Sequence, residues 1–305
     1  MKIAIIGGKS FLGKQLFLRL LNSNKVESFH IFGSSIEDKL LEYESVTFHQ
    51  YIYPKSTLNY KLLSTLDAIY FCSATGVQSN IVVTEEIIYG LNTFEPIKVA
   101  IELEKNNFKG KFITFGSYFE IGSNTIEKKF SESEVVFSKG NVPNHYCNSK
   151  RMLSRFISGH LHKIQWFHFI LPTIYGPTEN PIRLIPYLIN SILINEPIKV
   201  TSGTQLRQYI HIEDVIDLIT KILHDISEGN IYNVAPNNSI SIKELIETIF
   251  ETMSYNDENV SIISRVDENM KYLSLDTTKT QKVFNWEPKI NLIQGIKTYL
   301  KNDKR

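Results

Sequence analysis

The sequence predicts an α/β fold built on a parallel sheet, and three observations support this prediction. Residues 2–6 form a continuous apolar run rich in isoleucine, as buried parallel strands do. From Phe11 onward the apolar positions recur with a helical period. The same alternation of strand and helix continues to residue 171, which indicates right-handed βαβ units that bind ligands at the carboxyl ends of the strands.

Composition and charge exclude several classes of protein. The chain has 305 residues, enough for a large core, and its formal net charge of +1 comes with no run of like charges. Nucleic acid and acidic membranes are therefore not expected as partners. Two cysteines cannot build a disulfide framework, and no stretch approaches the roughly 18 apolar residues of a membrane helix, so we expect a cytoplasmic protein.

No metal site is expected. His160 and His162 are the only closely spaced histidines, and neither a carboxylate nor a cysteine stands at ligand spacing from them. We interpret the pair as a solvated helix end.

The first turn has the composition of a phosphate-binding loop. Residues 7–13 read GGKSFLG, a frame in which Ser10 replaces the middle glycine of a G-x-x-G-x-x-G pattern. Glycines allow a tight turn, and the N–H groups at the start of the next helix can receive a pyrophosphate. A plain glycine-rich βα turn is the alternative. The cofactor-binding residues predicted here are Gly7, Lys9, Ser10, Phe11, Leu12 and Gly13.

The second strand, residues 29–32, ends in Gly33, Ser34 and Ser35 without an acidic residue. An acid there would grip the adenosine ribose hydroxyls and would repel a 2′-phosphate. Two hydroxyls could instead hydrogen-bond that phosphate, and Lys9 could add charge. The sequence therefore favours NADP(H) over NAD(H), although two serines are also ordinary turn chemistry.

Three more strands are predicted at residues 44–53, 67–73 and 111–115. Between the last two lies a helical stretch, residues 81–105, with Asn92 in its middle and Pro96 as the expected break. Polar residues follow two of the strands, so they should lie on the ligand edge of the sheet. These residues are Ser73, Ala74, Thr75 and Ser117.

Tyr146 and Lys150 are the candidate proton-transfer pair. Their spacing puts both polar tips on one side of a helix. An ammonium close to a phenol favours the phenolate, which lowers the pKa of the phenol and makes it a better proton-transfer catalyst. The same spacing recurs at Tyr51 and Lys55, where Pro54 forbids an ordinary helix, so spacing alone is weak support.

The second half of the chain alternates less regularly. Proline and glycine at residues 172–177 mark a departure from the sheet. Ser241, with Glu244 three residues later, predicts a capping box at a helix start. The other elements predicted here are strands at 166–171, 198–200 and 230–234, and helices at 184–194, 212–224 and about 292–301.

Taken together, these motifs resemble the extended short-chain dehydrogenase/reductases, the family of nucleotide-sugar epimerases, dehydratases and reductases. The resemblance rests on GGKSFLG, Ser117, YCNSK, LPTIYGP, GTQLRQYIHIEDV and the closing segments DTTK and FNWEP. It implies a Rossmann-type doubly wound parallel sheet with a smaller mixed C-terminal substrate lobe. Residues 1–172, with about 205–235, would bind NADP(H), and residues 173–204 and 236–305 would bind a nucleoside-diphosphate sugar.

The resemblance also implies roles for individual residues. Tyr146 would exchange a proton with the sugar oxygen, Ser117 would hydrogen-bond the same oxygen, and Lys150 would bind the nicotinamide ribose and depress the tyrosine pKa. The cofactor site would further include Ser73, Ala74, Thr75, Asn92 and Pro172.

Arginines and lysines are the candidates for gripping the nucleotide. Arg207 would hold the diphosphate or ribose, for which its guanidinium fork is suited. The alternative is a surface salt bridge from Arg207 to Glu213 or Asp214. Arg183, Lys199 and Arg265 are further substrate-binding candidates, and each could equally be a solvated surface charge.

Departures from the family pattern narrow the expected reaction. The similar 4,6-dehydratases carry an Asp-Glu pair directly after the Ser117 position, where this chain has Tyr118 and Phe119, with Glu120 one residue late. Because this acid pair is missing, a dehydratase is disfavoured. Leu171 also replaces an arginine that many members carry before the proline, which removes one possible polar anchor near the cofactor.

The reaction expected is NADPH-dependent reduction of the C4 keto group of a nucleoside-diphosphate 4-keto-6-deoxy hexose, such as a dTDP- or CDP-linked sugar. FGSYFEIG, RLIPYLI and SGTQLRQYIHIEDV resemble the 4-ketoreductases that finish sugars for surface polysaccharides such as O-antigen. A nucleotide-sugar 4-epimerase and a non-catalytic NADP-binding regulator remain the alternatives. A homodimer through the helix of Tyr146 is possible on the family pattern.

Overall fold

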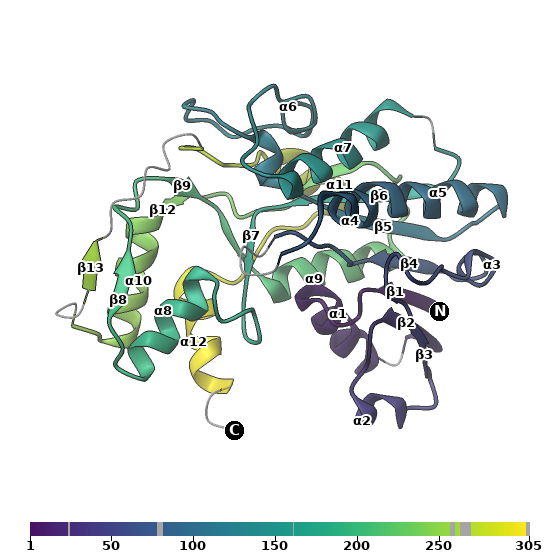
Figure 1. Ribbon diagram of the computed structural model, residues 1–305, viewed down its shortest axis with the longest axis horizontal. Coiled ribbons are helices and arrows are strands. Elements are labelled where there is room, and N and C mark those ends of the chain that lie inside the picture. The colour runs from purple at the N-terminus through teal and green to yellow at the C-terminus, as the bar shows by residue number, and fades with distance from the viewer. Residues whose placement is uncertain (24, 78–81, 161, 257–259, 263–269, 303–305) are drawn as a thin grey trace.

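A parallel sheet forms the centre of the protein, as expected from the sequence (Figure 1). The computed structural model describes residues 1–305 except 24, 78–81, 161, 257–259, 263–269 and 303–305. Within these residues seven strands form the main sheet in the order β11-β6-β5-β4-β1-β2-β3, and every neighbouring pair is parallel. Their bounds are Lys2–Ile6 (β1), Ser28–Gly33 (β2), Val46–Gln50 (β3), Ala68–Phe71 (β4), Lys111–Ser117 (β5), Gln165–Leu171 (β6) and Ile231–Asn233 (β11).

Helices cover both faces of this sheet because its central strands are apolar on both sides. In β1, Ile3 and Ile5 face one core cluster, while Ala4 and Ile6 face the other. Figure 1 shows α1 and α9 on one side of the sheet and α5 and α7 on the other. These helices span Phe11–Leu21 (α1), Glu95–Lys105 (α5), His145–Gly159 (α7) and Ile212–Lys221 (α9).

The long helical stretch is interrupted before Pro96 and not at it, which corrects the prediction. A short helix α4 (Glu85–Tyr89) passes into a π-helical segment, η1 (Gly90–Phe94), which passes directly into α5. Pro96 is the second residue of α5, so the π-helical segment ends directly before the residue pair that includes the proline. At Gly90 a β-carbon would lie 2.1 Å from the hydroxyl oxygen of Tyr53, so this close contact falls at the start of the π segment.

The C-terminal elements form a third core cluster of their own, drawn on the left of Figure 1. Its helices are α8 (Leu184–Leu193), α10 (Ile242–Met253) and α12 (Leu292–Asn302). The predicted capping box of α10 is confirmed, because Ser241 N donates to Glu244 Oε2 (2.6 Å) and Glu244 N donates to Ser241 Oγ (3.0 Å). The domain boundaries given above stay a prediction.

Short strands outside the main sheet confirm that the chain leaves it after Pro172. β7 (Thr173–Tyr175) pairs in parallel with β10 (Tyr209–His211). β9 (Leu206–Arg207) pairs with β12 (Ile240–Ser241), and β8 (Ile198–Val200) pairs with β13 (Val260–Ile262). The remaining elements are α2 (Asp38–Leu41), α3 (Tyr60–Leu63), η2 (Tyr118–Ile121), α6 (Glu132–Val136), η3 (Ile222–His224) and α11 (Thr278–Phe284).

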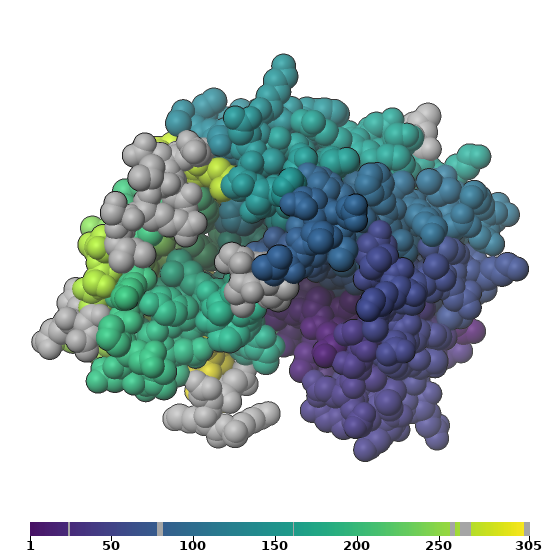
Figure 2. Space-filling view, viewed as in Figure 1, coloured from purple at the N-terminus to yellow at the C-terminus, as the bar shows by residue number. Residues whose placement is uncertain are grey.

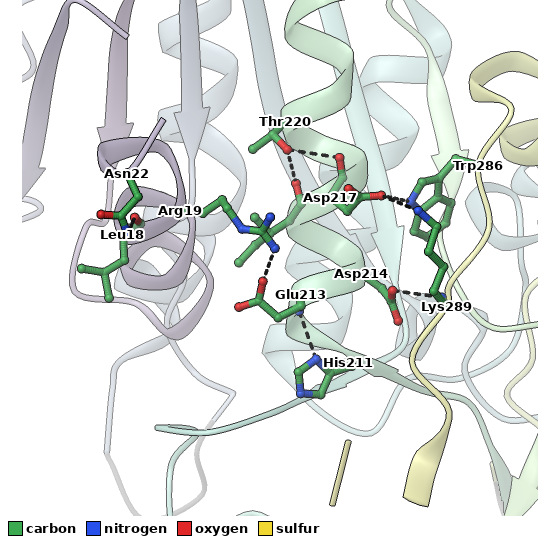
Figure 3. A network of polar contacts seen from close by, with 11 residues as sticks. Leu18, Arg19, Asn22, His211, Glu213, Asp214, Asp217, Thr220, Trp286 and Lys289 are labelled. Atoms are coloured by element: carbon green, nitrogen blue, oxygen red, sulfur yellow. Dashed lines mark hydrogen bonds and ion pairs between the residues drawn. The ribbon is translucent and has the colours of Figure 1, made fainter. Parts of the chain in front are cut away.

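Polar contacts of α9 join distant parts of the chain (Figure 3). Glu213 forms an ion pair with Arg19 of α1. Both carboxylate oxygens of Asp214 accept backbone N–H groups, from Lys289 (3.0 Å) and Ile290 (3.1 Å). The indole N–H of Trp286 donates to Asp217 Oδ2 (3.1 Å). The NWEP segment is thereby fixed along the side of α9.

Candidate active site

A cavity of about 350 Å³ lies where β1, β4, β5 and β6 end. Figure 2 shows a hollowed surface between the green C-terminal residues and the blue and purple N-terminal residues. The cavity walls bring together residues that are far apart in the sequence. The predicted site residues in these walls are Ser10, Phe11, Leu12, Ser73, Ala74, Ser117, Tyr146, Lys150, Pro172 and Arg183.

At two positions of the glycine turn, 7 and 13, only glycine fits. Gly7 has φ of +92°, and a β-carbon there would lie 2.6 Å from Ser73 N. At Gly13 a β-carbon would lie 2.4 Å from Gly7 O. Ser10 caps α1 by accepting a hydrogen bond from Gly13 N (3.0 Å). The turn is therefore a close-packed cradle at a helix start, which fits the pyrophosphate of a dinucleotide.

The end of β2 lies beside this turn. Lys9 Nζ donates a hydrogen bond of 2.8 Å to Ser35 Oγ, and Lys9, Ser34 and Ser35 are all exposed. A cation and two hydroxyls therefore lie together where the sequence places the adenosine ribose.

Asn92 lies outside the described cavity wall and supports it from behind, so its predicted contact with the cofactor stays a prediction. Its side chain is 1% exposed; Oδ1 accepts from Thr75 N, and Nδ2 donates to Thr75 O, each at 2.9 Å. Nδ2 also donates to Ser149 Oγ on α7 (3.0 Å). Because these bonds use both ends of the amide, Asn92 holds the loop after β4 against α7. Thr75 takes part through its backbone.

Ser117, Tyr146 and Lys150 come together from two elements. Ser117 ends β5, and α7 begins at His145 with Asn144 as its cap. Lys150 Nζ lies 5.9 Å from the centre of the Tyr146 ring and donates to Phe115 O (2.8 Å). All three predicted catalytic side chains line one cavity.

The electrostatics of the pair differ from the expectation. Burial raises the pKa of Tyr146, and Cys147 and Glu120 raise it further; Arg183 and a hydrogen bond from Ser117 oppose the shift. Lys150 is not among the groups that lower this pKa, and burial lowers its own pKa to about 8. Burial disfavours both the phenolate of Tyr146 and the ammonium of Lys150. The phenol is therefore held protonated at neutral pH.

A second cavity of about 200 Å³ adjoins the first and shares Phe119, Thr173, Glu179 and Arg183 with it. Arg207 lines this second cavity, is 9% exposed, and donates from Nη1 to Leu206 O (2.8 Å). Its predicted partners in a surface salt bridge are engaged elsewhere (Figure 3). The surface alternative for Arg207 is therefore wrong.

Two further basic candidates for substrate binding are Lys199 and Arg265. Lys199 is an exposed residue of β8 and belongs to neither wall, so its position gives no support to its predicted substrate role. Arg265 lies outside the described residues.

Glu179 is a site residue that the sequence reasoning missed. Its side chain is 6% exposed, lines both cavities, and forms an ion pair with Arg183 through Oε1 (3.2 Å). The hydroxyl of Tyr299 donates to Oε2 (3.1 Å). Burial raises the pKa of Glu179 to about 7. The spacing of Glu179 and Arg183 directly after LPTIYGP could have indicated the pair, but nothing in the sequence points to Tyr299.

The sequence predicts neither a metal site nor a membrane-spanning helix, and the next observations are limited to the described part of the chain. It contains no group of three or more His, Cys, Asp or Glu residues placed to hold a metal ion. His160 lies at the exposed end of α7, stacked 4.1 Å from Phe156. Across the same residues, no helix has the length and apolar character needed to span a membrane.

Comparison with known proteins assigns the chain to a family. The model of the NAD dependent epimerase/dehydratase family matches residues 3–235. The chain belongs to this family. The glycine turn, the cavity and the Ser117, Tyr146 and Lys150 trio all fall inside the matched region.

Curated relatives from this epimerase/dehydratase family modify nucleotide sugars, as their names say. Human dTDP-D-glucose 4,6-dehydratase is 29% identical over 204 residues, which are 61% of this chain and 54% of that protein. CDP-abequose synthase of Salmonella typhimurium is 24% identical over 147 residues, which are 46% of this chain and 49% of that protein. The chain spans about half the length of these relatives.

A solved structure confirms the predicted fold. UDP-glucuronic acid 4-epimerase from Bacillus cereus, in complex with UDP-glucuronic acid and NAD, matches with a TM-score of 0.82 over 99% of each chain at 20% identity. At this identity the likeness establishes the fold alone. Because that epimerase holds NAD, the NADP(H) preference of this chain stays a prediction.

Proposed function

We propose that the protein reduces the C4 keto group of a nucleoside-diphosphate 4-keto-6-deoxy hexose with NADPH. The observation that carries the proposal is the convergence of Ser117, Tyr146 and Lys150 in one cavity beside a phosphate-ready turn. The proposed products are precursors of surface polysaccharides.

The residues after Ser117 favour reduction over dehydration. Phe119 lines the cavity where a similar dehydratase would present an acid. Glu120 is fully buried, its Oε1 accepts from Ser117 N (2.7 Å), and it is absent from the described cavity wall. Among the residues that the structure describes, the turn after Ser117 therefore presents no acid pair to the cavity that could protonate and deprotonate neighbouring sugar carbons.

Tyr146 is the proposed proton donor. The reduced nicotinamide, when bound, supplies a hydride to the carbonyl carbon. Tyr146 gives its proton to the carbonyl oxygen, and Ser117 hydrogen-bonds the same oxygen as negative charge develops on it. One well-aimed donor of this kind stabilises the transition state by about 3–4 kcal/mol. Because the pKa of Tyr146 is raised, the phenol carries its proton before the reaction begins.

Lys9, Ser34 and Ser35 are proposed to bind the 2′-phosphate of NADPH. The 2.8 Å contact between Lys9 and Ser35 supports this, because it joins an ammonium and a hydroxyl at the end of β2. Arg183 and Arg207 are proposed to hold the substrate diphosphate from the walls of the two adjoining cavities.

The experiment that tests the proposal follows NADPH absorbance with dTDP-, CDP-, GDP- and UDP-linked 4-keto-6-deoxy hexoses. We expect oxidation of NADPH with at least one of them, and slower oxidation of NADH. A protein that interconverts C4 epimers without net oxidation is an epimerase, and that result would overturn the proposal. Binding of NADPH without turnover on any nucleotide sugar would instead favour a non-catalytic regulator.

A further inference from the structure

We infer that Glu120 is a positioning residue: it fixes the Ser117 turn through a buried hydrogen bond, and its negative charge keeps Lys150 and Tyr146 protonated. The part of the inference that concerns reduction rests on the proposed function. The part that concerns the charge of Lys150 does not, so the two can be tested separately.

Glu120 closes the turn that presents Ser117. Glu120 Oε1 accepts from Ser117 N (2.7 Å), and Ser117 Oγ accepts from Phe119 N (3.3 Å). Ser117 Oγ also accepts from the backbone N–H of Glu120, and this bond and the bond from Ser117 N to Glu120 form a capping box on η2. From α7, Arg151 Nε donates to the backbone oxygen of Glu120 (2.8 Å). The Ser117 hydroxyl is therefore held at the cavity by contacts that all involve residue 120 or its neighbours.

Gly116 makes room for this arrangement. A β-carbon at Gly116 would lie 2.7 Å from Glu120 Oε1 and 2.7 Å from His168 Nε2. The carboxylate and the imidazole thus lie directly behind the strand end that leads to Ser117. Glu120 is fully buried, and a buried carboxylate is costly even when it is hydrogen-bonded, which favours a role other than stability.

His168 belongs to the same buried cluster but carries no charge. Its Nδ1 lies 2.8 Å from Thr114 Oγ1, and its Nε2 lies 2.9 Å from Ser154 Oγ. Burial lowers the pKa of His168 to about 3, with a further contribution from Lys150. The imidazole is neutral at physiological pH and cannot balance the charge of Glu120.

Besides His168 of β6, the charged and titratable groups that act on Glu120 come from α7. Burial raises the pKa of Glu120 to about 7, while hydrogen bonds from Ser154 and Ser117 and the charges of Lys150 and Arg151 lower it. Conversely, Glu120 opposes the burial that lowers the pKa of Lys150. Glu120 also adds to the raised pKa values of two further α7 residues, Tyr146 and Cys147.

When Glu120 is ionised, its negative charge therefore favours the protonated forms of Tyr146 and Lys150. A reduction starts with a protonated phenol on Tyr146, and a carboxylate behind the pair disfavours the phenolate. Glu120 itself transfers no proton, because it is buried and lies outside the described cavity wall. It acts through Ser117 and Lys150.

The direct test is a titration of Lys150 by NMR in protein labelled with ¹³C at the lysine ε-carbons, with Lys150→Arg to assign the signal. In Glu120→Gln the amide oxygen still accepts from Ser117 N, but the charge is lost. We expect the pKa of Lys150 to fall by about one unit, a tenfold change in its ionisation constant. Glu120→Asp, which keeps the charge, should restore the wild-type titration. Unchanged titration in Glu120→Gln would overturn the inference.

A matched control variant and a measurement on the wild-type protein complete the test. Glu95→Gln removes a buried carboxylate of α5 that accepts from Tyr60, and it should leave the Lys150 titration unchanged. In the wild type, coupling to Glu120 should give the Lys150 signal a second inflection near pH 7. A single inflection would contradict the inference even if Glu120→Gln did not fold.

Kinetics separate this inference from the proposed function. In Glu120→Gln, the alkaline limb of kcat/KM for NADPH-dependent reduction should move to lower pH, with the dissociation constant of NADPH unchanged. A shifted Lys150 titration in a protein that reduces no keto sugar would support the role of Glu120 and refute the reductase. If the protein reduces a keto sugar and Glu120→Gln leaves the titration of Lys150 unchanged, only the inference about Glu120 is refuted.

Discussion

The ammonium of Lys9 and the hydroxyl of Ser35 lie 2.8 Å apart, and this contact joins the turn after β1 to the end of β2. In the main sheet β1 and β2 are neighbours, with Ile6 opposite Phe32. The contact therefore forms at the carboxyl edge of the sheet, where the proposed cofactor lies.

Lys9→Ala tests the proposed preference for NADPH. Loss of one charged hydrogen bond of about 1.5–3 kcal/mol weakens NADPH binding by roughly 10- to 100-fold and leaves NADH binding nearly unchanged. Fluorescence titration of both nucleotides measures this. Lys14→Ala is the matched control, because Lys14 pairs with Glu37 and lies outside the described cavity wall. Equal weakening of both nucleotides by Lys9→Ala would contradict the proposed phosphate contact.

Tyr146→Phe removes the proposed proton donor and keeps the ring. We expect kcat to fall by roughly 10²–10⁴-fold, the usual contribution of a general acid, with little change in NADPH affinity. Steady-state kinetics and a binding titration check the two halves. As a control, Tyr89→Phe removes a hydroxyl 3.1 Å from His145 Nδ1, outside the described cavity wall, and should leave kcat near wild type. Near-normal turnover by Tyr146→Phe would refute the assignment.

The raised pKa of Glu179 predicts a pH dependence of stability. The folded-state pKa is about 7 against an ordinary value of 4.5, so the folded protein holds this proton more tightly than the unfolded chain. The contribution of Glu179 to stability is therefore full below the unfolded value and is lost as pH rises through 7.

Glu179→Gln measures that loss. Because glutamine does not titrate, the free energy of unfolding of the variant should rise relative to wild type between pH 4.5 and 7, by about 3 kcal/mol at most. Urea denaturation at several pH values gives the difference. Loss of the ion-pair partner of Arg183 changes the free energy of unfolding of the variant by a constant amount. It does not produce the change with pH. A difference that is flat or falls with pH would contradict the prediction.

Asp214→Asn tests the network along α9 (Figure 3). Both oxygens of Asp214 accept backbone N–H groups, so an amide NH₂ must face one of them and leave it unpaired. We expect a loss of about 1–3 kcal/mol of stability. Asp217→Asn is the control, because the Asp217 side chain is 47% exposed and water can replace its contacts. Thermal unfolding that finds equal losses for both variants would argue against the role of the buried network.

The sequence predicted most of the main sheet because its strands are apolar on both faces. Residues 2–6 and 166–171 are buried runs, and their predicted positions match β1 and β6 to within one residue. Segments with mixed contacts were predicted less well. Residues 44–53 were predicted as one strand, but β3 spans only Val46–Gln50. Tyr51 N still donates to Gly33 O (2.8 Å) at the end of β2, and the Tyr51 side chain packs into the hydrophobic core.

The candidate site was predictable where function depends on local motifs. The glycine turn and the spacing of Tyr146 and Lys150 were recognisable in the sequence, and the structure brings these residues to one cavity. Residues that act through distant contacts could not be found this way. Glu179 depends on Tyr299, which is 120 residues further along the chain, and the raised pKa of Tyr146 results from burial that spacing does not reveal.

The stoichiometry of cofactor and sugar tests the central claim most directly. The protein is incubated with NADPH and a nucleoside-diphosphate 4-keto-6-deoxy hexose that it converts. The amount of NADPH oxidised and the amount of C4-hydroxy product formed are then measured in the same sample. The proposed reduction predicts equal amounts of the two, with deuterium from labelled NADPH appearing at C4 of the product. Product that accumulates without loss of NADPH, or deuterium that appears elsewhere, would contradict the account.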